Sequence, residues 1–343
     1  MHDITLEQCL EMRSHKATLV DVRSPGEYEQ FHIPGSINIP IFTDEERSEV
    51  GTIYKQESVD AAKERGLEIA SAKLPALYKQ YREISGPIVI YCWRGGMRSR
   101  TMATVMSLMG LRVHRLQGGI RSYRQWVQEQ LEHYELQAPC VVIAGHTGTG
   151  KTELLLRLAA DGYPVLDLEG LAAHRGSIFG HIGQEPRNQR MFDALLLERL
   201  MELEQQEAPY MMLEAESRRI GKITLPDFLL ESKQRGKVIQ ISMPIAERVH
   251  NLMKDYDPDQ HKEELIEAFT RIKDRIHTPI AHEISLSLKE ERYHEAAALM
   301  LEHYYDPRYE YATHSYDQAM ITIQAANVNE AEQFIKQQLT RHA

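Results

Sequence analysis

The stretch CVVIAGHTGTGKT (residues 140–152) joins an apolar run to a glycine-rich loop. The run has the length and composition of a buried parallel strand, and the residues that follow, TELLLRLAA, have the apolar spacing of a helix. Residues 145–152 match the phosphate-binding pattern G-x-x-x-x-G-K-[ST] at every fixed position. A strand, a glycine loop and a helix in this order predict an α/β domain with a phosphate site at the loop.

The residue types of this loop explain what it would bind. Glycines let backbone N–H groups converge on phosphate oxygens, and the helix N-terminus adds partial positive charge. Lys151 would reach the terminal phosphates, and Thr152 would ligate Mg²⁺ if that ion is bound. The predicted diphosphate site consists of Gly145, Thr147, Gly148, Gly150, Lys151 and Thr152.

A nucleotide hydrolase of this type carries an Asp at the end of a second apolar strand to hold the metal. Here the predicted strand YMMLEAES ends in Glu214 and Glu216, and Asp167 lies at the end of the predicted strand YPVLDLEG. Each of these carboxylates could ligate a metal ion, or it could be a helix-capping or solvated side chain. Magnesium is therefore a candidate cofactor, and the metal is otherwise unknown.

A second loop, CWRGGMRS (residues 92–99), follows the apolar run PIVIY. A thiol beside a helix N-terminus and arginines has a lowered pKa and becomes nucleophilic, so Cys92 is the predicted catalytic nucleophile. Because the loop is polar, we expect replacement of Cys92 to change stability little. The predicted anion-binding residues around the thiol are Arg94, Gly95, Gly96 and Arg98.

Length and composition indicate a globular chain of about two domains. The chain has 343 residues, 42% of them apolar, and a domain has ~150 residues. No apolar run approaches the ~20 residues of a membrane span, and the N-terminal residues lack the pattern of a signal peptide. Three cysteines are too few and too scattered for a disulfide framework. We therefore expect a cytoplasmic protein with no membrane partner.

The predicted boundary divides the chain into residues 1–138 and 139–343, both with alternating strands and helices. In the first, a charged helical stretch is inserted over residues 43–73. The second begins with the strand of the phosphate loop and contains a helical extension over residues 259–304. The fold class is α/β, with a parallel sheet expected in each domain.

The net charge of −10 opposes long-range binding of nucleic acid. However, arginines without acidic neighbours continue from the cysteine loop toward the end of the first domain. They could form an anion-binding surface or be scattered, solvated side chains. Beyond Arg94 and Arg98, the relevant residues are Arg100, Arg112, Arg115, Arg121 and Arg124.

The motifs of the first domain resemble the rhodanese domain, in which a loop cysteine carries persulfide or related sulfur and selenium species. The resemblance rests on CWRGGMRS and on LVDVRSPGEYEQFHIPGSINIP (residues 19–40). The resemblance also includes three polar residues that match the usual pattern of that family: Asp21, Arg23 and His32. It implies mostly structural roles for them. Phe31 stands where the family usually has Gly.

A rhodanese domain fused to a P-loop domain resembles the tRNA 2-selenouridine synthase family, nearly end to end. Several further stretches are characteristic in this order: DEERSEVGTIYKQ (44–56), LDLEGLAAHRGSIFG (166–180), LEAESRRIG (213–221) and EHYYDPRYEY (302–311). The resemblance implies a transferase whose partner is tRNA. The substrate would be the wobble uridine with sulfur at C2.

In that family, geranyl diphosphate alkylates the sulfur and selenophosphate then supplies the selenium that replaces it. The resemblance thus implies two co-substrates and an enzyme that produces selenophosphate as a further partner. It assigns Cys92 to the selenium step and the phosphate loop to the prenyl donor. Polar residues after two other predicted strands would complete the second site, or would only order their loops: Asp167, Glu169, His174, Arg175, Ser177, Glu214, Glu216, Arg218 and Arg219.

Two groups of residues have alternative interpretations. Met191, Met201, Met211 and Met212 could line a prenyl pocket, but core packing explains them better. The tyrosines Tyr304, Tyr305, Tyr309 and Tyr311 could stack on RNA bases or cap a helical subdomain.

The motifs are also compatible with an ATP-dependent tRNA sulfurtransferase, which would use the same two loops. A non-enzymatic, P-loop-regulated binding protein is a third hypothesis. The intact Cys92 argues against it, because inactive rhodanese modules typically lose the loop cysteine.

Overall fold

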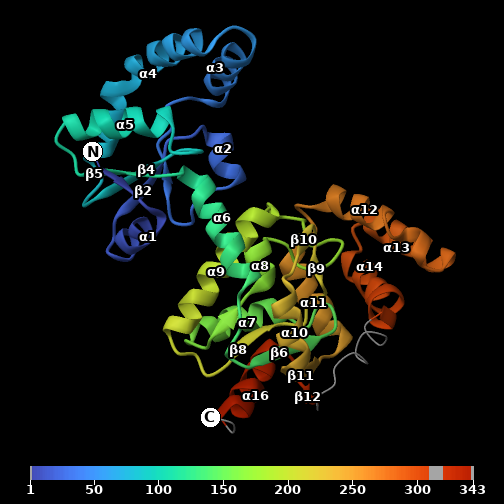
Figure 1. Cartoon of the computed structure of the whole chain (residues 1–343). Coiled ribbons are helices and arrows are strands. Elements are labelled where there is room, and N and C mark those ends of the chain that lie inside the picture. Colours follow the sequence, from blue (N-terminus) through green and yellow to red (C-terminus); the bar gives the residue numbers. More distant parts are fainter. Residues whose placement is uncertain (1, 309–319, 341–343) are drawn as a thin grey trace. The chain divides into compact units, whose positions relative to one another are not determined.

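The computed structural model describes residues 2–308 and 320–340 (Figure 1). The chain divides into two compact units, residues 1–133 with residues 193–195, and the rest of residues 134–343. The predicted boundary after residue 138 lies in the connection that follows α6 (Gly119–Glu132) and precedes β6 (Cys140–Gly145). Both units are α/β with a parallel sheet, which confirms the predicted fold class.

The first sheet has the order β1-β5-β4-β2-β3, and all its strand pairs are parallel. All four side chains of β4 are buried, because this inner strand is covered on both faces. The strands are β1 (His2–Ile4), β2 (Thr18–Asp21), β3 (Ile37–Asn38), β4 (Ile88–Tyr91) and β5 (Val113–Leu116). In addition to α6, this unit contains the helices α1 (Leu6–Ser14), α2 (Pro25–Gln30) and α5 (Met97–Leu108).

The charged insertion forms two helices that pack against each other, α3 (Asp44–Gln56) and α4 (Val59–Arg82). Thr43 caps α3, with its hydroxyl accepting from the N–H of Glu46 at 3.3 Å. The insertion extends beyond the predicted end at residue 73. Apolar residues of α4 such as Ile69 and Leu77 pack into the core of the unit, and this burial sustains the longer helix.

A buried ion pair joins the end of β2 to the segment after α2. The Arg23 guanidinium donates to the Asp21 carboxylate at 2.5–3.0 Å and to the carbonyl of Phe31 at 2.6 Å. Arg23 and Asp21 are 1% and 0% exposed, so neither charge is solvated and each depends on the other. The ring of His32 stacks on Tyr28 at 4.1 Å, and its Nδ1 lies 2.9 Å from the carbonyl of the same tyrosine.

The second sheet has the order β12-β11-β6-β8-β7, again with parallel pairs only. Its strands after β6 are β7 (Val165–Leu166), β8 (Met211–Glu214), β11 (Lys237–Ser242) and β12 (Ile321–Gln324). A separate antiparallel hairpin is formed by β9 (Arg219–Ile220) and β10 (Ile223–Thr224). The predicted strand at residues 163–170 is wrong beyond Leu166. There Asp167 accepts from the N–H of Gly170 at 2.7 Å and starts a helix instead.

The sheet carries α7 (Lys151–Ala160), α8 (Leu168–Ala172), α9 (Gln189–Gln205), α10 (Asp227–Arg235), α11 (Ile245–Tyr256) and α16 (Val328–Thr340). The predicted helical extension consists of α12 (Lys262–Thr270), η1 (Lys273–Arg275), α13 (Thr278–Lys289), α14 (Tyr293–Met300) and the π-helix η2 (Leu301–Tyr305). It has a core of its own, centred on residues such as Phe269, Ile284 and Leu288.

The structure bears on whether the four methionines line a prenyl pocket or pack in the core, and on whether the tyrosines can stack on RNA. Met191, Met211 and Met212 are buried and Met201 is half-buried, which favours core packing. Tyr304 is buried in the helical core. The Arg308 guanidinium lies over its ring, 3.7 Å from the centroid, so the ring is not free to stack on RNA. Tyr309 and Tyr311 lie outside the described residues.

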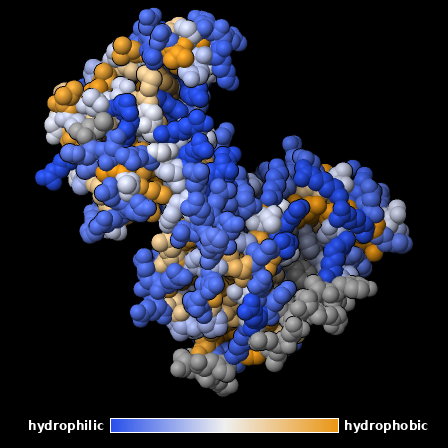
Figure 2. Space-filling view, in the orientation of Figure 1, coloured by the Kyte–Doolittle hydropathy of each residue, from blue (hydrophilic) through white to orange (hydrophobic). Residues whose placement is uncertain are grey.

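The face shown in Figure 2 is mostly hydrophilic, with apolar side chains over the α5 region of the first unit. Met97 and Leu108, at the two ends of α5, are 60% and 82% exposed. Within the described residues, no helix combines the length and the apolar character needed to cross a membrane.

The buried ion pair gives the first testable prediction. Asp21→Ala should destabilise the chain by about 3–5 kcal/mol, because it leaves the Arg23 charge buried without its partner. Denaturant unfolding measures the change. Asp60→Ala, which breaks the exposed pair with Lys63, is the control and should change stability little. Equal effects of the two variants would contradict the structural role of the buried pair.

Candidate functional site

The cysteine loop begins where the buried strand β4 ends. The Cys92 side chain is 3% exposed, and its Sγ lies 3.2 Å from the hydroxyl oxygen of Ser99 at the start of α5. The residue packs in the apolar core of the unit with Ile90 and Met102. The prediction that Cys92 lies in polar surroundings is therefore wrong, because the loop turns the thiol inward against the sheet. Replacement of Cys92 should cost some stability.

The N-terminus of α6 holds the loop from behind. The N–H of Ile120 donates to the carbonyl of Cys92 at 2.9 Å, and the N–H of Arg121 donates to the carbonyl of Trp93 at 3.2 Å. Gly95 has φ +64°, and a Cβ there would lie 2.8 Å from the carbonyl oxygen of Leu116. Only glycine fits both the conformation and the space.

The arginines around this loop have different environments. The Arg98 guanidinium donates to Glu27 at 2.5 and 3.2 Å, and Arg94 is exposed. Arg115 is only 5% exposed, pairs with Asp3 and donates to the carbonyl of Gly95 at 2.7 Å. Arg115 therefore supports the loop and does not belong to an exposed basic surface, contrary to the sequence-based expectation.

The phosphate loop follows the buried strand β6 in the second unit. Gly148 and Gly150 have φ +83° and +69°, and Gly150 directly precedes α7. The Lys151 ammonium donates to the carbonyls of Gly145 at 2.8 Å and His146 at 3.3 Å. The Lys151 ammonium therefore lies at the phosphate loop, as the motif predicts.

Helix α11 fixes the loop from the side, which no sequence motif indicated. The Arg248 guanidinium donates to the carbonyl of Thr147 at 2.8 Å and to Asp306 at 2.6 and 2.9 Å. The Asn251 amide donates to the carbonyl of Gly148 at 2.9 Å. About a hundred residues separate these partners in the chain, so local sequence patterns contain no signal for them.

A cavity of about 500 Å³ opens at this loop. The predicted residues that line it are Gly145, Thr147, Gly148, Gly150, Lys151, Thr152, Glu169, Arg175, Ser177 and Glu216. Further lining residues that the sequence did not indicate include Leu252, Asp255, Tyr256 and Arg308. Tyr305, one of the tyrosines considered for RNA stacking, also lines the cavity.

Five predicted residues do not line this cavity. Glu214 is fully buried and accepts from the N–H of Leu168 at 3.1 Å, and Asp167 caps α8. The His174 ring packs against Gly180 and Gly221. Arg218 is exposed and pairs with Asp227 at 2.7 Å, and Arg219 is exposed on β9.

Two carboxylates meet beside Thr152. The Thr152 hydroxyl donates to Glu169 at 2.6 Å, and Glu169 and Glu216 both approach Gly176, where a Cβ would lie 2.7 Å from an oxygen of each. Burial, with a further contribution from the neighbouring Glu216 carboxylate, raises the pKa of Glu169 to about 8. A proton is therefore retained here near neutral pH.

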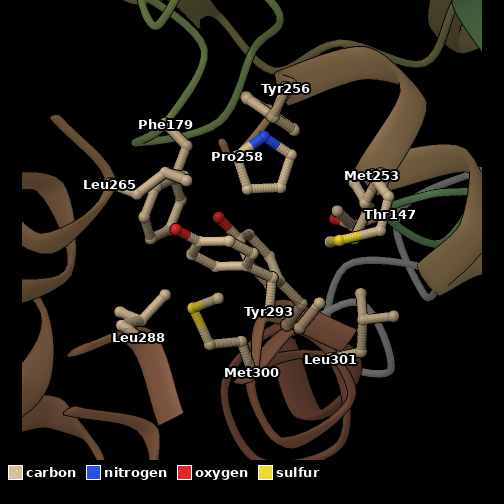
Figure 3. A pocket seen from close by; sticks show the side chains of 13 residues that line it. Thr147, Phe179, Met253, Tyr256, Pro258, Leu265, Leu288, Tyr293, Met300 and Leu301 are labelled. Atoms are coloured by element: carbon tan, nitrogen blue, oxygen red, sulfur yellow. The ribbon is translucent and has the colours of Figure 1, made fainter. Parts of the chain in front are cut away.

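An apolar pocket adjoins the phosphate cavity (Figure 3). The two share Thr147, Leu252, Tyr256 and Tyr305 as lining residues. Side chains of α11, α13 and η2 converge on the apolar pocket, which has a volume of about 50 Å³. Its other lining residues are Phe179, Met253, Pro258, Leu265, Leu288, Tyr293, Ala297, Met300 and Leu301.

The folds and loops define a protein with a rhodanese-like domain followed by a P-loop domain. Family models agree: residues 5–126 match the rhodanese-like domain, and residues 138–342 match the AAA domain of tRNA 2-selenouridine synthase. The chain belongs to the tRNA 2-selenouridine synthase family, which is a family of enzymes.

Two relatives show the extent of the similarity. A tRNA 2-selenouridine synthase of Nitrosomonas europaea is 34% identical over 259 residues, covering 74% of this chain and 67% of the relative. One of Sulfurovum sp. (strain NBC37-1) is 30% identical over 366 residues, covering 97% of this chain and 99% of the relative. The similarity therefore extends across both domains.

The raised pKa of Glu169 predicts a pH-dependent contribution to stability. An unfolded Glu loses its proton near pH 4.5, whereas the folded one keeps it to about pH 8. The contribution is present below pH 4.5 and is lost as pH rises to about 8, because in this range the unfolded chain gains stability by releasing a proton that the folded state still holds. Glu169→Gln cannot ionise, so its Tm relative to wild type should rise across this range.

Thermal unfolding of both proteins between pH 5 and 8.5 measures this difference, with about 2–4 °C expected for each kcal/mol. Glu231→Gln changes an exposed glutamate of α10 and should show no such trend. A Tm difference between Glu169→Gln and wild type that does not vary with pH would contradict the assignment.

Proposed function

We propose that this chain converts 2-thiouridine at the wobble position of tRNA to 2-selenouridine. Geranyl diphosphate first alkylates the sulfur, and selenium from selenophosphate then replaces the S-geranyl group. One observation carries the proposal: the phosphate cavity shares its walls with an apolar pocket. This combination suits a ligand with a diphosphate head and an apolar tail.

The diphosphate head would bind at the glycine loop. Lys151 and the backbone amides of the loop supply positive charge and hydrogen bonds, and Arg175 and Arg308 line the same cavity. These groups stabilise the charge that develops on the diphosphate as it leaves. A bound magnesium ion would be held mainly by phosphate oxygens and water, since within the described residues no three His, Cys, Asp or Glu side chains are grouped to hold a metal.

The geranyl tail would enter the apolar pocket past Thr147. A volume of about 50 Å³ is too small for a ten-carbon chain, so binding requires side chains to move. Met253 and Met300 have flexible side chains and line the pocket, which makes this adjustment inexpensive. Leu288 lies across the pocket from Thr147 and would face the end of the tail (Figure 3).

The alkylation step balances without a redox partner. The thiocarbonyl sulfur attacks C1 of the geranyl group, the bond from C1 to oxygen breaks, and the diphosphate leaves with the electron pair. The base then loses its N3 proton and becomes a neutral S-geranyl species. Glu216 lies in the lining of the cavity and would accept this proton, whereas Glu169 already holds a proton near neutral pH.

The selenium step is assigned to the first domain. A thiocarbonyl sulfur is a poor leaving group, whereas the S-geranyl group can leave as geranyl thiol. Cys92 would attack C2 and displace geranyl thiol, which takes up a proton. The selenium of selenophosphate would then attack C2 and displace the Cys92 sulfur, and water would cleave the P–Se bond to release phosphate. Arg94 with the amides of Gly95 and Gly96 would bind selenophosphate. Arg98 can contribute only if it exchanges its pairing with Glu27 for the anion. An enzyme that makes selenophosphate is the partner this step requires.

Removal of the loop lysine tests the prenyl donor. Lys151→Ala should weaken binding of geranyl diphosphate by about 1.5–3 kcal/mol, because it removes a charge-assisted contact. Calorimetric titration of wild type, Lys151→Ala and the exposed control Lys222→Ala measures this change. If geranyl diphosphate binds equally well to Lys151→Ala while ATP binding is lost, the ATP-dependent sulfurtransferase would be favoured instead.

Removal of the thiol should separate the two steps. Cys92→Ala should abolish formation of 2-selenouridine but leave S-geranyl-2-thiouridine among the products, because the steps use different loops. Mass analysis of nucleosides after reaction of tRNA with both co-substrates measures each product. Cys140→Ala, which also removes a buried cysteine, should retain both steps. Normal selenouridine formation by Cys92→Ala would overturn the assignment.

A further inference from the structure

A cavity of about 280 Å³ lies beside the cysteine loop, and Arg94 is the one lining residue that the chemistry assigned above already uses. Its volume approaches the lower end of the range for small-molecule sites, ~300–1,000 Å³. The walls come from the loop, from α6 and from the segment after α2. The lining residues are Phe31, Trp93, Arg94, Ile120, Arg121 and Arg124.

The arginines of this cavity differ from three others in the same unit. Those three are paired with carboxylates: Arg23 with Asp21, Arg98 with Glu27 and Arg115 with Asp3. Across residues 2–308 and 320–340, the side chains of Arg94, Arg121 and Arg124 make no ion pair or hydrogen bond, and Nε of Arg124 is buried without an acceptor. Guanidinium groups that converge without protein acceptors suit phosphate oxygens.

The aromatic walls indicate that the ligand is more than a small anion. Trp93, the residue after Cys92, is 36% exposed, whereas Phe31 is buried and stacks on Tyr123 at 6.4 Å. Unpaired RNA bases stack on aromatic side chains of this kind. The hydrogen bond from the N–H of Arg121 to the carbonyl of Trp93 holds the aromatic and basic walls together.

We propose that this cavity binds the wobble nucleotide of tRNA, with the base stacked on Trp93 and the adjacent phosphates held by Arg121 and Arg124. The inference rests on the proposed function, which makes tRNA the substrate. A tetrahedral selenophosphate alone would leave the aromatic walls without a role. The net charge of −10 also makes a local cluster necessary for RNA binding. Stacking here would bring the base to the residue next to Cys92.

The two tryptophans of the chain make the site directly observable. They are Trp93 and Trp126, so Trp126→Phe leaves Trp93 as the single tryptophan. This variant is titrated with an RNA stem-loop of the anticodon arm that carries 2-thiouridine at the wobble position. Binding is followed in parallel by the fluorescence anisotropy of a dye on the RNA. We expect quenching of Trp93 fluorescence with the same midpoint as the anisotropy change.

Arginine variants of the otherwise unchanged chain test the cavity without altering a tryptophan. Arg121→Ala/Arg124→Ala should weaken RNA binding about tenfold or more, because two charge-assisted contacts are lost. The matched control is Arg82→Ala/Arg112→Ala, which removes two exposed arginines of the same unit outside the cavity. It lowers the net charge equally and should change affinity by less than about threefold.

The outcomes separate this site from the proposed function. If the RNA binds without changing Trp93 fluorescence, or if both arginine pairs have the same effect, the nucleotide site is overturned. If formation of 2-selenouridine is nevertheless detected by nucleoside mass analysis, the proposed function stands. Matched quenching together with selective loss in Arg121→Ala/Arg124→Ala supports the site.

Discussion

Both sites depend on backbone that enters the left-handed region just after an inner parallel strand ends. After β6, Gly148 and Gly150 have φ +83° and +69°, which lets the chain turn sharply into α7. After β4, Gly95 has φ +64° in a space that no Cβ can share. An L side chain is strained in this conformation, so these turns require glycine and place amide groups at the strand ends. The remaining site residues are arranged around these two turns.

Pairing of buried and half-buried charges decides which basic groups are available to ligands. In the first unit, Arg23, Arg98 and Arg115 bind carboxylates and serve the fold. Arg121 and Arg124 lie close to Arg115 in the sequence but line a cavity. A guanidinium that already binds a protein carboxylate has few donors left for a ligand. A guanidinium without a protein acceptor can donate to a ligand phosphate, and these hydrogen bonds offset its loss of hydration.

Helix α11 and the helical extension together shape what the P-loop domain can accept. Helix α11 holds two carbonyls of the loop through Arg248 and Asn251, and the same helix lines both the phosphate cavity and the apolar pocket. The hydrogen bonds that hold the loop and the walls of the apolar pocket therefore come from the same helix. The carboxyl pair of Glu169 and Glu216 adds proton-binding capacity beside Thr152.

The local motifs by themselves determined the two loops, their key residues Cys92 and Lys151, and the α/β class, because these depend on short-range spacing of glycines and apolar residues. Only the tertiary structure decided which polar side chains reach the cavities. Glu169 and Glu216 meet at Gly176, whereas Glu214 is buried in the sheet, because β8 ends at Glu214 and Glu216 lies in the loop beyond it. The clamp by Arg248 and the paired state of Arg115 arise from contacts about a hundred residues apart, which spacing along the chain cannot encode.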